Sequence, residues 1–172
     1  MARNIVWILG LCMLLILSAC TSTPKQSQQM PLNPEWVKQL QNTALPIKLP
    51  VPVDGIKARQ LKDTWGASRS SGRTHEGIDI MAPRGTKVTS TTEGLVADLR
   101  DNNLGGKVVW MMGPQGSWHY YAHLDTHKRG LKVGDRVKKG DVIGYVGNSG
   151  NARHTAPHLH YGIYLQGKGR GT

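Results

Sequence analysis

Glycine-containing turns divide the chain between residues 77 and 165 into short segments, and this spacing restricts the fold more than any other feature. The segments are rich in β-branched and aromatic residues, and none has the length of a typical helix, so each predicts a β-strand. They are 77–82, 86–91, 94–99, 107–112, 117–124, 135–139, 141–147 and 158–165. With 21 Gly and 9 Pro in the chain, this pattern predicts an all-β domain of antiparallel strands, a sandwich or a partly open barrel.

The first twenty residues have the pattern of an export signal. Arg3 precedes an apolar stretch at 5–17, which is too short to span a membrane comfortably and has the length of a signal-peptide core. The following LSAC (17–20) resembles the lipobox of bacterial lipoproteins, which implies that residues 1–19 are removed and Cys20 carries a lipid. An ordinary signal peptide or membrane anchor is the alternative. Since Cys12 lies in the removed part, the mature chain can form neither a disulfide framework nor a cysteine nucleophile.

Residues 20–55 are predicted to connect the lipidated cysteine to the folded domain. The polar, proline-containing stretch 21–34 is typical of a tether. A short helix is expected at 33–41, where Asn33 can cap the N-terminus and Pro34 occupies the first helical position. Residues 45–55 hold too many prolines for a regular element. The predicted division is therefore 1–19, 20–55 and 56–172, with the hypothesis that residues 21–55 cover the functional groove as an inhibitory segment.

The formal net charge of +11 suits a surface that meets an anionic polymer or anionic lipid. A solvated basic face explains the charge equally well. Nucleic acid is disfavoured as a partner, because no strand interleaves basic and aromatic residues.

Four residues in two short motifs have the spacing of a metal site. His75 and Asp79 are four apart, and His158 and His160 are two apart; even separations place side chains on one face of an extended chain. Two histidines and a carboxylate, with water in the fourth position, form a catalytic zinc pattern. Each motif alone is more often an ordinary surface feature. The helical HExxH motif and the GxSxG serine elbow are both absent.

Taken together, these motifs resemble a known family. THEGID (74–79), YAHLD (121–125) and PHLHY (157–161), in this order within residues 60–165, are similar to the lysostaphin-type zinc endopeptidases, peptidase family M twenty-three. The resemblance implies an antiparallel β-fold with a long open groove and one Zn²⁺ per chain, held by His75, Asp79 and His160. It assigns catalytic roles to His158 and His123. The hairpin at 133–147 also resembles that of barrel-sandwich hybrid domains.

Two departures from the family pattern concern the last strand. HLHY stands where HLHF is commoner, and we expect that change to be harmless. The chain stops at Thr172, whereas family members often continue, so the stability of the last edge is in question. The site itself is not affected by either departure.

The expected function is hydrolysis of peptide crosslinks in bacterial peptidoglycan, of the D-alanyl–diaminopimelate type, by a monomer anchored at the periplasmic face of the outer membrane. The alternative is a non-hydrolytic wall-binding module that activates murein amidases, and the complete set of ligands argues against it. His158 is the expected principal base, because the mature chain has only three Glu, at 35, 76 and 93.

Further histidines and arginines receive weaker predictions. Arg69, Arg73 and His154 are candidate substrate contacts, with an ordinary surface role as the alternative. His119 shares strand parity with His123, so it either faces the groove as a supporting partner or lies at a sheet edge.

Overall fold

The computed structural model describes residues 32–69 and 72–165, and it contains all eight predicted strands. Their bounds are β1 Ile78–Met81, β2 Lys87–Thr89, β3 Gly94–Asn102, β4 Gly106–Met112, β5 Trp118–His127, β6 Arg136–Val137, β7 Val142–Val146 and β8 His158–Tyr164. One α-helix, α1, spans Pro34–Asn42. Three 3₁₀ turns complete the described elements: η1 Ala58–Gln60, η3 Pro114–Gly116 and η4 Gly150–Ala152.

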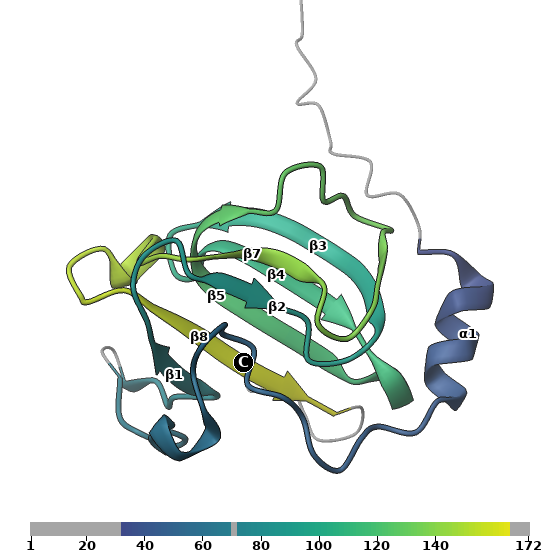
Figure 1. Cartoon of the computed structure of the whole chain (residues 1–172), viewed down its shortest axis with the longest axis horizontal. Coiled ribbons are helices and arrows are strands. Elements are labelled where there is room, and N and C mark those ends of the chain that lie inside the picture. The colour runs from purple at the N-terminus through teal and green to yellow at the C-terminus, as the bar shows by residue number, and fades with distance from the viewer. Residues whose placement is uncertain (1–31, 70–71, 166–172) are drawn as a thin grey trace, which may run out of the picture.

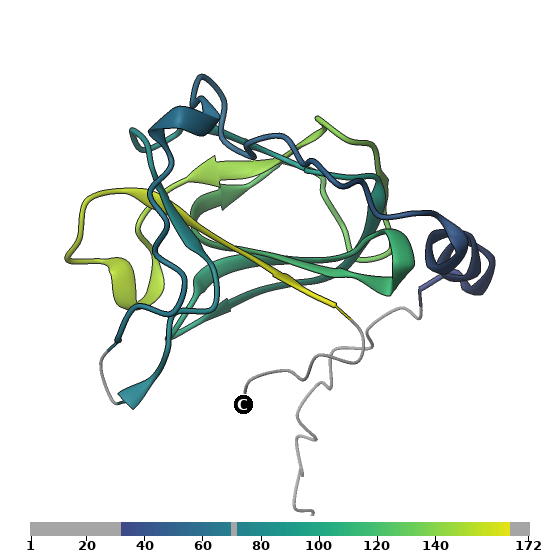
Figure 2. The same cartoon turned by 90° about the horizontal axis from the view of Figure 1, so that it is seen from below.

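The strands form one bent antiparallel sheet. The order along it is β1-β8-β5-β4-β3-β6, and β7 also pairs with β5 and carries β2. The bend brings β2 and β7 over β4 and β5 (Figures 1 and 2). These two strands hold the large buried side chains of Met111 and Tyr121. Among the described residues β1 and β6 do not pair, so the sheet stays open. The prediction of an all-β fold with antiparallel, unclosed sheets is confirmed.

The main core lies between the two parts of this bent sheet. Tyr121, Met111 and Leu159 from one part meet Val88 and Ile143 from the other, all fully buried. Burying one such aliphatic side chain stabilises the fold by about 1.5–3 kcal/mol relative to leaving it exposed. Strand alternation sends the neighbours of these residues to the outer face, and the candidate site is built on that face.

The segment before the strands is packed onto the domain. Asn33 caps α1 by accepting hydrogen bonds from the backbone N–H groups of Glu35 and Trp36, as the sequence predicts. Leu40 of α1 is buried against Met112 in a second, smaller apolar cluster, at one end of the sheet (Figure 1). Val53 bridges to Val88 and is buried in the main core. Residues ahead of position 56 therefore contribute to both apolar clusters.

The predicted signal peptide, Cys20 and the C-terminal tail lie outside the described residues. Within 32–69 and 72–165, no helix is both long enough and apolar enough to span a membrane.

Candidate metal centre and active site

A cavity of about 910 Å³ opens over β1, β8 and the turn before β8, and it is lined by the histidines of the THEGID, YAHLD and PHLHY motifs. His75, Asp79, His123, His158 and His160 all line it. They come from three separate stretches of sequence, which the sheet brings together.

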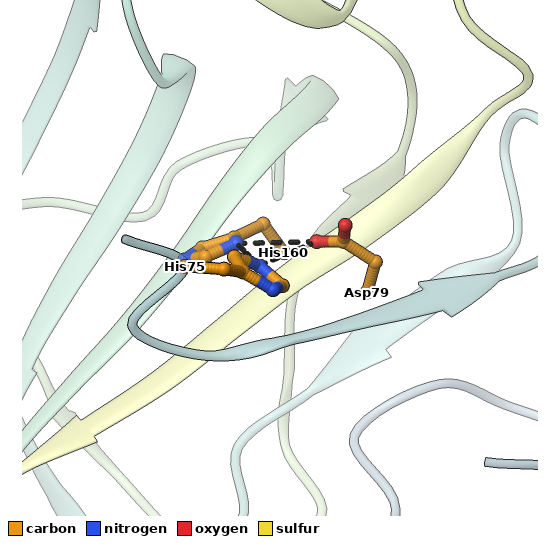
Figure 3. Close-up of side chains that lie close together, drawn as sticks. All are labelled: His75, Asp79 and His160. Atoms are coloured by element: carbon orange, nitrogen blue, oxygen red, sulfur yellow. Dashed lines mark hydrogen bonds and ion pairs between the residues drawn. The ribbon is translucent and has the colours of Figure 1, made fainter. Parts of the chain in front are cut away.

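Three of these residues converge on one point. His75 Nε2 lies 2.8 Å from His160 Nδ1 and 3.0 Å from Asp79 Oδ1, and His160 Nδ1 lies 3.2 Å from the same oxygen. Figure 3 shows the three side chains pointing toward one another, His160 from β8 and Asp79 from β1. Atoms bound to one tetrahedral zinc at 2.0–2.2 Å would lie about 3.4 Å apart. The observed separations are slightly shorter, so the cluster could hold a metal ion with little rearrangement.

Strand register explains this convergence. Asp79 on β1 stands directly opposite His160 on β8, and residues opposite each other in an antiparallel pair project to the same face. Gly77 precedes β1 and leaves room for the ring of His160. A Cβ at position 77 would lie 2.6 Å from the Tyr161 carbonyl oxygen and 2.8 Å from His160 Cε1. The glycine of the THEGID motif is therefore a steric requirement of the site.

Hydrogen bonding fixes which nitrogen of His75 faces the cluster. His75 Nδ1 lies 2.6 Å from the Thr64 carbonyl oxygen. Because a carbonyl oxygen can only accept, Nδ1 carries the proton and Nε2 presents a lone pair to the cluster. Burial lowers the pKa of His75 and favours its neutral form. Thr64 is not among the residues predicted from sequence, because a backbone acceptor leaves no sequence signal.

Asp79 is held as a carboxylate. Burial alone would raise its pKa, but the hydrogen bond from His160 and the neighbouring imidazoles hold the pKa of Asp79 well below its ordinary value. Its second oxygen, Oδ2, forms an ion pair with Arg69. Arg69 thereby turns Oδ1 toward the two histidines, in the way that supporting partners orient metal ligands.

His158 and His123 form a second pair beside the cluster. Their ring centroids lie 5.0 Å apart. His158 donates from Nδ1 to the Ala156 carbonyl, and His123 donates from Nδ1 to the Ser149 carbonyl. In the neutral form of each ring the lone pair is therefore on Nε2, and His158 Nε2 is 4.0 Å from Asp79 Oδ1. Burial, followed by the neighbouring His158, lowers the pKa of His123 to about 4.

A β-bulge brings His123 to the cavity. The β4–β5 register shifts between Lys107 and Val109, and His123 has a left-handed φ of 62°. This backbone conformation is uncommon for a residue other than glycine, and bulges re-aim side chains beside active sites. The His123 N–H donates to the Gly105 carbonyl, 2.8 Å away. As a result His123 joins Tyr120 and Ala122 at the cavity, although alternation would place it with the buried Tyr121.

His119 shows the consequence of that bulge. It is fully buried, so the expectation that it faces the groove or lies at an edge is wrong. Parity with His123 fails because the bulge lies between them. Ser117 Oγ donates to the Pro114 carbonyl and so accepts from His119 Nε2, and His119 Nδ1 accepts from the Tyr161 hydroxyl at 2.8 Å. Tyr161, at the place where phenylalanine is commoner, supplies this donor.

This buried network predicts a pH dependence of stability. Burial lowers the pKa of His119 to about 4 from an ordinary value of 6.5, so the unfolded chain binds a proton at a higher pH than the folded one. The stabilisation is complete above pH 6.5 and is lost progressively as the pH falls toward 4, by about 3 kcal/mol. Denaturant unfolding of the wild type and His119→Gln at pH 7 and 4.5 isolates this contribution from the other histidines. Equal pH slopes in the two proteins would contradict it.

The comparison with known families decides the assignment. The family model described as "Peptidase family M23" matches residues 73–170, more than half of the chain. The chain belongs to peptidase family M23. All five residues that the resemblance singles out, His75, Asp79, His123, His158 and His160, lie in the matched region and at one cavity.

Several known proteins are similar to part of this chain. The L-Ala–D-Glu endopeptidase of Bacillus subtilis (strain 168) is 42% identical over 110 residues, which cover 60% of this chain and 34% of that protein. The peptidoglycan DD-endopeptidase ShyC of Vibrio cholerae is 36% identical over 95 residues, 55% of this chain and 21% of that protein. The match thus spans about a third of the first relative and about a fifth of the second. The lysostaphin catalytic domain from Staphylococcus simulans has a similar fold, with a TM-score of 0.55, 30% identity, and coverage of 61% of this chain and 79% of that one.

The remaining predicted site residues are placed differently. Arg69 and Arg73 line the cavity of this M23 domain. His154 does not: its side chain is exposed and accepts a hydrogen bond from Arg153. None of the described residues 32–55 lines the cavity, so this part of the predicted inhibitory segment does not cover it.

Proposed function

We propose that the protein is a zinc-dependent endopeptidase that hydrolyses peptide crosslinks of bacterial peptidoglycan. One observation carries this proposal: His75 Nε2, Asp79 Oδ1 and His160 Nδ1 converge, and His158 Nε2 lies 4.0 Å from the same Asp79 oxygen. The cluster supplies three ligands, and two basic nitrogens stand beside it. Catalytic zinc sites combine three protein ligands with one open position in this way.

The donor set fits zinc. Imidazole nitrogen and carboxylate oxygen both suit Zn²⁺, and the cluster holds Asp79 ionised and the His75 lone pair directed inward. His75 Nε2 and His160 Nδ1 lie 2.8 Å apart. Without a metal ion, two nitrogens at this distance require a proton between them, and a bound cation takes the place of that proton. When bound, zinc supplies a Lewis acid that polarises the scissile carbonyl and acidifies a water molecule. His75, Asp79 and His160 would hold it.

Two histidines of this chain perform the proton transfers in the proposed mechanism. His158 Nε2 removes the proton from the attacking water, because Nδ1 is engaged by the Ala156 carbonyl and Nε2 lies beside the cluster. Burial and the neighbouring His158 lower the pKa of His123 to about 4, so its ring is neutral at pH 7 and Nε2 must first accept a proton. It accepts the second proton of the attacking water and passes it to the leaving amine, which also receives the proton held by His158, so both imidazoles return to the neutral form. The carbonyls of Ala156 and Ser149 hold both rings in orientation.

The bond and the location are also part of the proposal. We infer the D-alanyl–diaminopimelate crosslink as substrate and the periplasmic face of the outer membrane as location, with a lipid on Cys20 as anchor. The signal-like residues 1–19 and LSAC (17–20) support the anchor, and relatives named for L-Ala–D-Glu and for DD-endopeptidase activity support cleavage of wall peptides. The net charge of +11 suits an anionic wall polymer.

Digestion of purified crosslinked sacculi tests the function. The protein, with and without a chelator, is incubated with diaminopimelate-type walls, and the released muropeptides are identified by mass spectrometry. We expect crosslinked dimers to disappear and their monomers to accumulate only without chelator. If no bond is cut, and the same protein instead stimulates an added murein amidase, the endopeptidase proposal is wrong and the activating module is correct.

A further inference from the structure

An aromatic surface extends from the candidate metal centre across the outer face of the sheet. It consists of Tyr120, Trp110 and Tyr164, and we name it the aromatic shelf. The Tyr120 ring centroid is 5.7 Å from that of His160. The Trp110 ring centroid follows at 4.4 Å from Tyr120 and 5.5 Å from Tyr164. Tyr120 and Tyr164 line the same cavity as His160, so the shelf continues the site.

Strand register builds the shelf and limits its extent. Trp110 on β4 stands opposite Tyr120 on β5, and alternation directs both away from the core, where Met111 and Tyr121 are buried. Trp118 is the next ring, 6.4 Å from Trp110, and it packs against the apolar cluster formed with α1. The shelf therefore extends from the cavity to Trp118, which separates it from α1. All three of its rings are partly exposed.

We propose that the aromatic shelf binds sugar rings of the glycan strand to which the substrate peptide is attached. This inference rests on the proposed function. A pyranose ring has an apolar C–H face and a polar rim, and aromatic side chains with a polar tip offer a matching surface. Burial raises the pKa of Tyr120 to about 12, so its hydroxyl remains neutral and can hydrogen-bond to a sugar.

The distances favour cleavage of a peptide bond that lies several residues from the sugar-bearing end of the stem peptide. β4 is separated from β8 by β5 alone, and Trp110 aligns through Tyr120 with Gly162, two residues beyond His160. The backbone of Trp110 therefore lies about 10 Å across the strands and about 7 Å along them from that of His160. A stem peptide of four residues spans about 13 Å when it is fully extended. The first peptide bond of that stem lies only about 3.5 Å from its sugar-bearing end. A glycan on the shelf thus places the far end of the stem, where the D-alanyl crosslink forms, at the metal centre.

Two substrates with the same crosslinked peptide, one carrying its disaccharides and one stripped of sugar, test the shelf. For the wild-type zinc-loaded protein we expect kcat/KM to be roughly five- to tenfold higher for the sugar-bearing dimer. Trp110→Leu keeps an apolar side chain over the sheet and should bring this ratio close to one. Tyr145→Leu removes a ring from β7, outside the cavity lining, and should leave the ratio unchanged. A wild-type ratio of one, or an unchanged ratio in Trp110→Leu, overturns the proposal.

A binding measurement separates failure of the shelf from failure of the endopeptidase assignment. Glycan strands freed of peptide by an amidase are added to the wild-type protein, and the indole N–H signals are followed by NMR. We expect the Trp110 signal to shift and that of the exposed Trp65 to stay in place. If Trp110 does not respond, the shelf proposal is wrong even if the crosslinks are cut. If it responds while neither dimer is cleaved, the shelf stands and the endopeptidase assignment fails.

Discussion

Replacing His158 by alanine should lower turnover on crosslinked peptide by about 10²–10⁴-fold, the usual contribution of a general base, while zinc content stays unchanged. His158 is not one of the three converging groups, and its Nδ1 is engaged by the Ala156 carbonyl. Its removal therefore deletes a base and leaves the ligands in place. The zinc content is measured by atomic emission and the turnover from initial rates at pH 7, both on one preparation of each protein.

Two further variants interpret that result. His160→Ala should lose both metal and activity, because His160 Nδ1 belongs to the converging set. His154→Ala should lose neither, because that side chain is exposed and does not line the cavity. Near-normal turnover of His158→Ala with zinc bound would show that His158 is not the base. His123 would then be the remaining imidazole beside the cluster with a free Nε2.

The second large effect is expected at a residue without functional groups. Gly77→Ala should weaken zinc binding by about 10–100-fold, the range seen when the surroundings of a metal ligand are disturbed, and activity at limiting zinc should fall with it. The added methyl would meet the His160 ring and the Tyr161 carbonyl at 2.8 and 2.6 Å. These contacts are too short, so the ring or the strand must move. Competition with a chromophoric chelator measures the affinity.

Gly130→Ala is the matched control for that substitution. Gly130 has a left-handed φ of 81° and open space around it, so alanine there should destabilise the fold by about 1 kcal/mol without changing zinc affinity. If Gly77→Ala binds zinc as tightly as the wild type, then the packing of His160 over Gly77 does not position this ligand.

The strands and the first four site residues could be predicted because local pattern decides them. Segments such as 141–147 combine β-forming residues with flanking turns, and the observed β7 lies within that range. Alternation correctly places His158 and His160 on one face of β8. His75 also lies beside Asp79, as its spacing predicts, although it precedes β1. The cap at Asn33 is equally local. In each case the residues that determine the conformation are neighbours in sequence.

What could not be predicted depends on backbone irregularity and on partners distant in sequence. The bulge at His123 carries no sequence mark, and it moves His123 to the cavity while His119 stays on the buried face with Tyr121. The carbonyl that orients His75 is the backbone carbonyl of Thr64. Every residue has such a group, so no residue type marks this contact in the sequence. The tyrosine at position 161 is expected to be harmless, and the sequence does not show that its hydroxyl bonds to Thr91 and His119. These contacts depend on β8 lying beside β5.

The central claim, that one zinc held by His75, Asp79 and His160 drives hydrolysis of the wall crosslink, is tested most directly by titrating the metal-free protein. Zinc is added stepwise, and the rate of crosslink cleavage is followed together with bound metal. We predict a rate that rises linearly from near zero to a plateau at one zinc per chain, and no response in His160→Ala. Full cleavage by the metal-free protein, or equal restoration of His160→Ala by zinc, would contradict the account.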